Sequence, residues 1–451
     1  MQTFTHQAGT WKWGVLCLLF LAPFFFLSYG FANHYAAGLS DVPSIVFAWE
    51  KYIPLWPWTI VPYWSIDLFY GLSLLLCWNK FELKQHVLRL FSAQLISISC
   101  FLLFPLKFSF ERPELHGFFG LWFDILMGFD KPFNQAPSLH ILLLVILWDF
   151  YRRHVASAYR WFVHLWSFLI GVSVLTTWQH HFIDIPTGIW VGALCLWLFP
   201  LYTTSPLQAE KVQQRTLRHF KFACYYLIVA APLAFLALYL QGWALWLAYP
   251  ASSFFLVACA YALNRPHFFQ KQADGSMSIA AWILFAPYFC LAKLNSRLWT
   301  RSHTEDSLIL NHNTTKIYLG RIPSHQHAKS YSGLLDCCAE LPLKQQQSYQ
   351  QYLSLDLIPV QPEQLHLAVQ AFNQLMSLQQ SSNSVLIFCA LGYSRSSSVL
   401  AAWLIQTNQA DNVEAAIHII RKARPWIVLS AKQLDHIDAY QKEYLKQQVK
   451  T

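Results

Sequence analysis

The sequence carries little charge for its length. Only 12% of its 451 residues are charged and 55% are hydrophobic, and the mean hydropathy is +0.31. A soluble protein would carry roughly 25% charged residues, so most of the chain falls outside that class. Long apolar runs, rich in the 35 Phe and 20 Trp, fill the chain up to about residue 295 and indicate segments that face lipid. The sequence after that point is polar and Gln-rich, as in an ordinary soluble domain.

The ten cysteines follow no disulfide or metal-binding spacing. Adjacent Cys337 and Cys338 suit a buried strand better than a zinc site, because no second Cys-x-x-Cys and no His pair accompanies them. We therefore expect no metal and no cofactor. Cys389 differs from the others through the motif around it. Six cysteines lie inside apolar runs, where cysteine acts as a small hydrophobic residue: Cys17, Cys77, Cys100, Cys195, Cys224 and Cys259.

A basic domain that would suit nucleic acid is also missing. The net charge is +9, but from residue 302 onward 12 Lys and Arg stand against 11 Asp and Glu. The excess positive charge therefore lies in short loops of the membrane part. Such an excess concerns membrane topology and argues against a nucleic-acid partner.

The apolar runs predict eight transmembrane helices. The first could be a signal peptide, but it is longer than a typical signal core and has a weak basic start, which favours an uncleaved anchor. The fourth is short as an apolar run. The predicted spans are Trp13–Phe31, Trp58–Trp78, Val87–Leu106, Ser138–Tyr151, Trp161–Trp178, Phe182–Leu201, Phe222–Leu240 and Trp243–Leu263.

Positive charges predict a cytoplasmic N-terminus. With that orientation, eleven cations lie inside before the eighth span and four lie outside, and eight spans return the chain to the cytoplasm. The apolar segment Ser278–Lys293 is short and contains Pro287, so we expect an interfacial helix on the inner surface; if it spans instead, the C-terminal domain moves outside. The inside cations are Lys12, Lys80, Lys84, Arg89, Arg152, Arg153, Arg160, Lys211, Arg215, Arg218 and Lys221, and the outside ones are Lys51, Lys107, Arg112 and Lys131.

The strongest motif follows a β-like run at 384–388 and precedes a helical run at 397–405. A strand, a tight loop and a helix N-terminus together form a natural phosphate site, because the loop amides point at the anion. The motif reads Cys389, Ala390, Leu391, Gly392, Tyr393, Ser394, Arg395, Ser396, and we expect all eight residues to surround the phosphate.

Each side chain of this motif has a chemical use. Arg395 offers a planar fork for two phosphate oxygens, and Gly392 allows close backbone approach. The positive field favours the Cys389 thiolate, the nucleophilic form, and Ser396 can hydrogen-bond the sulfur when it leaves. The competing interpretation is a buried cysteine with an arginine six residues further on, a common spacing by itself.

With Ile317–Gly320, Leu335–Glu340 and Arg424-Pro425, this motif resembles the dual-specificity branch of the protein tyrosine phosphatase superfamily over about residues 315–445. The resemblance implies an α/β fold, a central sheet flanked by helices. The family usually has His before the Cys, whereas Phe388 stands here, which removes one hydrogen bond to the loop.

The resemblance also implies a general acid on a loop about thirty residues before the cysteine. Asp356 lies 33 residues before Cys389 and is the only carboxylate between Glu340 and Glu363. It would protonate the leaving oxygen and then activate water. The alternative is a surface aspartate at a strand end.

A second set of polar residues lies at span ends that the predicted topology places outside. Arg112 can clamp phosphate, and His180 can attack phosphorus, with Asp184 one helical turn away to hold its tautomer. His140 can protonate the leaving alkoxide, and Ser138 with the helix N-terminus can bind phosphate oxygens. Polar residues at span ends can also be simply interfacial, and that alternative stays open.

Arg112-Pro113, Pro137-Ser-Leu-His140 and His180-x-x-x-Asp184 resemble the type 2 phosphatidic acid phosphatase superfamily over about residues 55–205, in particular its inositol phosphorylceramide synthase-like branch. The resemblance implies a metal-free six-helix core. The sequence departs from the family pattern in three places: Lys107 is five residues before Arg112 rather than seven, Leu139 replaces Gly, and Val174 stands where Arg is expected. Hydrolysis and head-group transfer therefore both remain open.

The sequence thus predicts an all-α polytopic membrane domain followed by an α/β dual-specificity phosphatase domain. We expect a bifunctional membrane phosphatase acting on a phospholipid or other phosphomonoester, in a bacterial inner membrane, with a periplasmic membrane site and a cytoplasmic C-terminal domain. The alternative is a degenerate membrane receptor or scaffold that anchors an active phosphatase. The expected divisions are 1–54, an anchor and outer loop; 55–205, the membrane enzyme; 206–301, two spans and the interfacial helix; and 302–451, the phosphatase domain.

Overall fold

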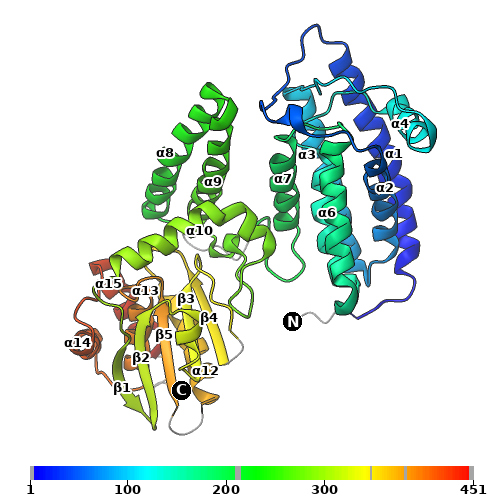
Figure 1. The fold of residues 1–451 in the computed structure, drawn as a ribbon. Coiled ribbons are helices and arrows are strands. Elements are labelled where there is room, and N and C mark those ends of the chain that lie inside the picture. The colour runs from blue at the N-terminus through cyan, green and yellow to red at the C-terminus, as the bar shows by residue number, and fades with distance from the viewer. Residues whose placement is uncertain (1–4, 209–214, 346–347, 380–382, 446–451) are drawn as a thin grey trace. The chain divides into compact units, whose positions relative to one another are not determined.

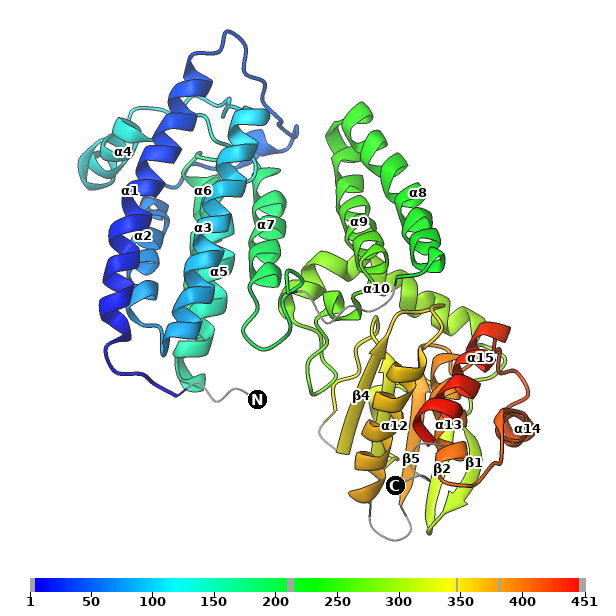
Figure 2. The same ribbon diagram turned by 180° about the vertical axis from the view of Figure 1, so that it is seen from behind.

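The computed structural model describes residues 5–208, 215–345, 348–379 and 383–445. Lys211, one of the cations predicted inside, lies outside these residues. The chain divides into two compact units (Figures 1 and 2): the first comprises Met1–Leu207 with Leu240–Trp243, and the second comprises Gln208–Tyr239 with Ala244–Thr451. Helices α8–α10, expected in a division of their own, therefore share a unit with the C-terminal α/β domain.

The first unit is a bundle of apolar helices. Helix α5 packs against α2, α3, α6 and α7, while α1 packs on α2 and α3. The helices are α1 (Thr10–Ala37), α2 (Ile60–Leu75), α3 (Lys80–Leu103), α4 (Gly117–Phe129), α5 (Leu139–His154), α6 (Arg160–Thr176) and α7 (Asp184–Leu198).

Small residues bring α5 and α7 close together. A Cβ at Gly188 of α7 would lie 2.8 Å from the Ser138 carbonyl oxygen, and one at Gly192 would lie 2.8 Å from Cβ of Val145. This small-xxx-small spacing lets two helix backbones approach closely. It brings the start of α5, with His140, beside the start of α7, with Asp184.

Each predicted span overlaps a helix, and two further apolar helices occur. Helix α4 lies in a segment predicted as an outer loop and packs through Phe123 and Leu126 on Tyr63 and Ile141. Among the described residues, six helical segments are long and apolar enough to cross a membrane, which indicates a membrane protein; the number of spans stays a prediction. The six are Thr10–Ala37, Lys80–Leu103, Ser157–Thr176, Leu217–Leu240, Gly242–Ala262 and Ile279–Trp299.

The second unit joins three apolar helices to an α/β domain, which confirms the expected fold class in outline. Its elements are α8 (Leu217–Leu240), α9 (Ala248–Ala262), α10 (Ile279–Trp299), β1 (Ser307–His312), β2 (Thr315–Arg321), α11 (His325–Ala328), β3 (Gly333–Cys338), β4 (Ser348–Ser354), α12 (Pro362–Ser377), β5 (Ser384–Cys389), α13 (Arg395–Gln406), α14 (Val413–Ala423) and α15 (Ala431–Tyr440).

The strands form one five-stranded sheet in the order β1-β2-β5-β3-β4. Only β1 is antiparallel to its neighbour, and the central strand β5 is parallel to both β2 and β3. Side chains on β5 alternate between the two faces: Val385 and Ile387 belong to one core cluster, and Leu386 and Phe388 to the other. Cys337 and Cys338 are fully buried on β3, as the sequence indicated.

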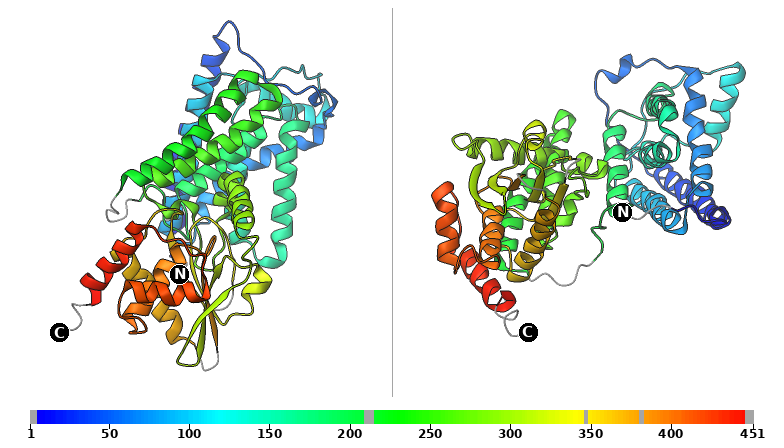
Figure 3. Two further views of the ribbon diagram at one scale, coloured as in Figure 1. Left: turned by 90° about the vertical axis from the view of Figure 1, so that its left-hand side faces the viewer. Right: turned by 90° about the horizontal axis from the view of Figure 1, so that it is seen from below.

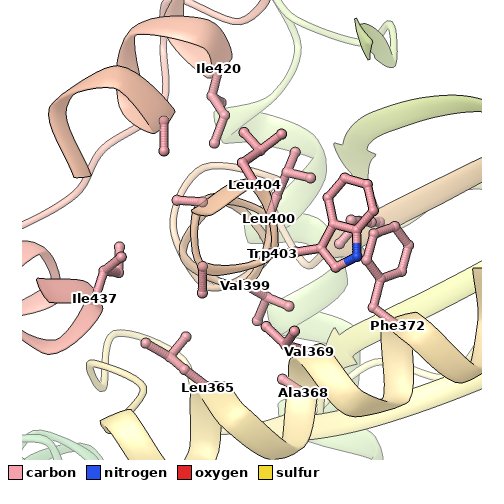
Figure 4. Close-up of a cluster of buried hydrophobic side chains, with 14 of the residues drawn as sticks. Leu365, Ala368, Val369, Phe372, Val399, Leu400, Trp403, Leu404, Ile420 and Ile437 are labelled. Atoms are coloured by element: carbon pink, nitrogen blue, oxygen red, sulfur yellow. The ribbon is translucent and has the colours of Figure 1, made fainter. Parts of the chain in front are cut away.

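Helices α12–α15 cover the first face of the sheet. Figure 4 shows α13 at the centre of this cluster, with Val399, Leu400, Trp403 and Leu404 directed toward neighbouring helices and Phe372 of α12 beside the indole. The rings of Phe372 and Trp403 are 5.0 Å apart in an edge-on arrangement. This packing fixes α13, whose first residue is Arg395.

Helix α10 covers part of the second face. It packs against α9, and its Ala292 contacts the cluster that contains Leu386 and Phe388. In Figures 1 and 3, α10 runs across the ends of α8 and α9 on the side of the sheet. Helix α10 therefore links α9 to the second face of the sheet.

A buried ion pair also joins the segment before α10 to the sheet. Lys271 Nζ lies 2.5 Å from Asp336 Oδ2 and donates to the Cys338 carbonyl at 2.6 Å, and neither charged side chain is exposed. Tyr349 donates to the same Asp336 oxygen at 2.7 Å. Lys271 and Met277 form an isolated antiparallel β-bridge. The network attaches this bridged segment to strand β3.

Candidate active sites

The Cys389 sulfur lies at the carboxyl end of β5, beneath a loop that leads directly into α13. The Gly392 N–H donates to Sγ at 3.2 Å and the Ser396 hydroxyl donates to it at 3.3 Å. Cys389 is only 2% exposed. Donors directed at the sulfur stabilise a thiolate, so the local geometry suits a nucleophilic cysteine.

The loop needs glycine at position 392. Gly392 has φ +70°, a conformation that side chains rarely adopt, and a Cβ there would collide with the Gly320 carbonyl oxygen. The buried Arg424 donates from Nε to the Gly392 carbonyl at 2.9 Å, which gives a reason for the Arg424-Pro425 motif.

The other loop residues are held by their neighbours. The Tyr393 carbonyl accepts from the Val428 N–H at 2.9 Å, and the Ser394 hydroxyl accepts from Gln433 at 2.5 Å. Ala390 is buried and Leu391 is half-buried.

Arg395 is buried and points toward two carboxylates. Its guanidinium donates to both Glu340 oxygens at 2.9 and 2.6 Å and to the Ser354 carbonyl at 2.8 Å, and it lies 3.0 Å from Asp356 Oδ1. Although burial opposes it, the Arg395 charge holds the pKa of Glu340 below its usual range. Glu340 therefore stays ionised and orients the fork, a role that sequence analysis did not assign.

Asp356 follows the end of strand β4 and lies 3.0 Å from Arg395 of the cysteine loop, so its role as the general acid stays a prediction. Withdrawal from water raises the pKa of the Asp356 carboxyl and the nearby Glu340 charge raises it further, while Arg395 opposes both effects. A raised pKa extends the pH range in which this carboxyl is protonated, which suits a general acid.

In the first unit, the structure brings His180 and Asp184 together. His180 Nδ1 lies 3.1 Å from Asp184 Oδ2, and both side chains are buried. A carboxylate on Nδ1 fixes the tautomer that leaves Nε2 free to act as an acceptor or nucleophile. The Ser138 N–H donates to the Asp184 carbonyl at 3.2 Å, which ties the two helix starts together.

The neighbouring histidine is held on both sides. His181 Nδ1 donates to Glu50 Oε2 at 2.9 Å, and its Nε2 accepts from the Ser109 N–H at 3.1 Å. Neither nitrogen is left for a substrate. This geometry supports His180 over His181 as the reactive residue.

His140 stacks on Tyr63, with ring centroids 4.1 Å apart, and lies close enough to His180 to interact electrostatically. Its Nε2 is buried and has no hydrogen-bond partner among the described residues. Asp184 Oδ1 and Arg112 Nε are also buried and have no hydrogen-bond partner among the described residues. Buried polar atoms are normally paired, so these atoms mark a polar site between the helix ends.

Arg112 joins this cluster but is partly committed elsewhere. Its NH2 group donates to the Trp178 carbonyl at 2.8 Å, and the guanidinium stacks over Phe123. The buried Asp130, which accepts from Tyr29 at 2.8 Å, interacts electrostatically with both Arg112 and His180. Sequence analysis missed Asp130; its position at the end of an apolar run was the available signal.

Comparison with known proteins bears on the C-terminal domain. Residues 317–443 match the family described as the catalytic domain of dual specificity phosphatases. These residues are a dual-specificity phosphatase domain. They contain the whole Cys389 loop, Asp356 and Glu340, so this phosphatase domain is of the class that hydrolyses phosphoric monoesters. A search of curated proteins gives no match to the chain.

Solved structures match about a third of the chain. PTPMT1 in complex with PI(5)P is 20% identical, with a TM-score of 0.28, and the match covers 32% of this chain and 98% of that one. Human DUSP28 is 16% identical, with a TM-score of 0.27, covering 31% and 99%. A leucine rich repeat and phosphatase domain containing protein from Entamoeba histolytica is 16% identical, with a TM-score of 0.26, covering 33% and 98%.

Proposed function

We propose that the chain is a bifunctional membrane phosphatase, and that its phosphatase domain hydrolyses phosphomonoesters through a phosphocysteine intermediate. The supporting observation is the convergence of the Cys389 sulfur and its two donors with the Arg395 fork and the Asp356 carboxyl. The Cys389 thiolate attacks phosphorus, Arg395 binds the equatorial oxygens, and protonated Asp356 gives its proton to the leaving oxygen. Asp356 then takes a proton from the water that releases phosphate, and Ser396 stabilises the departing thiolate.

Substrate binding requires a rearrangement within this site. Asp356 pairs with Arg395 at 3.0 Å, so an incoming phosphate replaces that carboxylate on the guanidinium. The displaced Asp356 loses its ion pair, which favours its protonated form. Phosphate binding therefore prepares the acid for the step that needs it.

The test uses the purified full-length protein and p-nitrophenyl phosphate in the presence of EDTA. We expect metal-independent turnover that vanadate inhibits and that Cys389→Ser abolishes. Full activity in Cys389→Ser would show that another group is the nucleophile.

We also propose that the first unit handles lipid phosphates, by hydrolysis or head-group transfer. The supporting observation is the buried His180–Asp184 pair beside the unpaired His140 Nε2. His180 attacks phosphorus, Asp184 holds its tautomer and stabilises its charge, and His140 protonates the leaving alkoxide. Arg112 and Ser138 bind the phosphate oxygens. With fewer cations than its family pattern, this site should be weak.

This second activity is measured in the Cys389→Ser background with a phosphatidic acid vesicle and EDTA. His180→Ala should remove the residual phosphate release. His181→Ala should lower the melting temperature, because it removes the Glu50 contact, yet keep most activity per folded molecule. His164→Ala, on α6 with a Trp148 hydrogen bond, serves as a matched control. No activity on any lipid phosphate would support the alternative of a degenerate scaffold that anchors the phosphatase domain.

The proposed location is a bacterial inner membrane with the phosphatase domain inside. Helix α10 supports an interfacial placement, because Leu291, Leu294 and Leu298 are all more than half exposed along one side of it and Lys293 and Arg297 flank them. A C-terminal alkaline phosphatase fusion, active only outside, should be silent. An active fusion would mean that α10 spans and that both sites share a face.

A further inference from the structure

The cysteine loop of the phosphatase domain contacts helix α10 directly. Ser296 donates from its hydroxyl to the Ala390 carbonyl at 2.6 Å, and both groups are buried. Tyr393 donates to the Trp299 carbonyl at 3.1 Å. The nucleophile's loop is therefore attached to a helix that lies before residues 317–443, the part of the chain that matches the phosphatase family.

The segment that carries Asp356 is attached to the other two apolar helices. Tyr261 of α9 donates from its hydroxyl to the Asp356 carbonyl at 3.2 Å, and Arg218 at the start of α8 donates from Nε to the Leu357 carbonyl at 2.6 Å. Leu357 has φ +59° and a half-exposed side chain. A non-glycine residue in this conformation persists only when its surroundings impose it.

Three tyrosines, one from each apolar helix, meet beside the site. The Tyr226 ring of α8 lies 5.2 Å from the ring of Tyr261 of α9 and 5.8 Å from the ring of Tyr288 of α10. Tyr261 and Tyr288 are almost completely buried. All three interact electrostatically with the Glu340 and Asp356 carboxylates. The hydroxyl cluster thus faces the acidic side of the catalytic site.

We propose that α8–α10 position the general acid of the phosphatase domain, with Tyr261 and Arg218 holding the Asp356 segment beside Arg395. Tyr261 is a positioning residue, since it contacts the Asp356 backbone rather than the substrate. The inference rests on the proposed function, in which Cys389 is the nucleophile and Asp356 the acid. It makes acid catalysis in this domain depend on the apolar helices rather than on residues 317–443 alone.

The leaving group provides a readout that a purely structural role would not give. An alkoxide is a poor leaving group and needs a proton from Asp356, whereas p-nitrophenolate leaves readily without one. A misplaced acid therefore slows hydrolysis of an alkyl phosphate much more than hydrolysis of p-nitrophenyl phosphate. General loss of folding would lower both rates together.

The experiment compares Tyr261→Phe with wild type in the full-length protein, on glycerol phosphate and on p-nitrophenyl phosphate. Tyr261→Phe keeps the ring and removes one hydrogen bond, so kcat on glycerol phosphate should fall about 3- to 10-fold, with less than about a 2-fold change on the aryl ester. The matched control is Tyr249→Phe on the same helix, which removes a hydroxyl that donates to the Ile283 carbonyl at 2.5 Å away from the site; it should leave both rates unchanged.

The second arm repeats Tyr261→Phe in the Asp356→Asn background. With no acid left to position, the added substitution should have no further effect on glycerol phosphate. Equal losses on both esters, an equal loss in Tyr249→Phe, no loss at all, or a full additional loss in the Asp356→Asn background would each overturn the positioning role. If the proposed function is wrong, Cys389→Ser retains activity. If only the positioning role is wrong, Cys389→Ser is inactive and Tyr261→Phe gives one of the contradicting outcomes above.

Discussion

The two candidate sites are built in opposite ways. Around Cys389, the sulfur, Arg395 and the Gly392 carbonyl have partners, and the nucleophile and phosphate donors come from eight consecutive residues. Around His180, the proposed site residues come from three separate segments, and His140 Nε2 and Asp184 Oδ1 lack partners in the described part of the chain. The first site is preorganised by its backbone, and the second depends on how helices pack.

The largest expected effect falls on the preorganised site. Asp356→Asn removes the proton donor and should lower kcat on an alkyl phosphate by about 10²–10⁴-fold. In wild type, kcat/KM should fall as pH rises through the Asp356 pKa, because the acid works only when protonated. Since that pKa is raised, the fall should occur above the range of an ordinary aspartate.

The measurement is a pH profile of both proteins. The variant should lose the high-pH fall while keeping the low-pH limb. An unchanged profile in Asp356→Asn would show that another group supplies the proton.

A substitution at Lys271 should test whether the segment before α10 is anchored to the phosphatase domain. Lys271→Ala leaves the Asp336 charge buried without its partner, which should cost about 3–5 kcal/mol of stability. Lys442→Ala is the control, because its ion pair with Asp438 is exposed and is worth about 1 kcal/mol or less. Thermal unfolding of the two full-length variants gives the comparison. Equal melting temperatures would contradict this anchoring.

The smallest effect concerns the packing that assembles the histidine site. Gly188→Ala places a Cβ against the Ser138 carbonyl and Ile141 and should destabilise the first unit by about 1–3 kcal/mol. It should also reduce His180-dependent lipid phosphate release while leaving p-nitrophenyl phosphate hydrolysis unchanged. Gly171→Ala is the control, since its nearest neighbour would be a Leu144 methyl at 3.5 Å. Reduced hydrolysis of the aryl ester in Gly188→Ala would show that the two sites are not independent.

The contiguous site could be predicted from sequence because its chemistry is local. A β-branched and aromatic run, a glycine with positive φ and a helix start occur in order, and the observed strand Ser384–Cys389 and helix Arg395–Gln406 follow the expected pattern. Predicting Asp356 as a site residue required one assumption about a long-range contact, that the loop about thirty residues before the cysteine lies beside it. Glu340, which orients Arg395, was visible as a motif residue, but its bidentate contact could not be read from spacing.

The remaining features depend on tertiary contacts that leave no periodic signal. Helix α4 has only 13 residues, too few for the long apolar run from which a span is predicted. The hydrogen bond from Tyr261 to the Asp356 carbonyl joins residues 95 positions apart, and a tyrosine at the end of an apolar run looks like an ordinary interfacial anchor. Asp130 also stands at the end of an apolar run, and its contact with Tyr29 and its proximity to Arg112 and His180 arise only in the folded structure.

The most direct test of two separate phosphate chemistries is to locate the covalent phosphate. Full-length protein would be mixed with phosphatidic acid or p-nitrophenyl phosphate, quenched rapidly, digested and examined by mass spectrometry. We expect phosphate on the Cys389 peptide in wild type and His180→Ala, and on the His180 peptide in wild type and Cys389→Ser with the lipid substrate. Phosphate on neither peptide, or on Cys389 alone with every substrate, would contradict the bifunctional account.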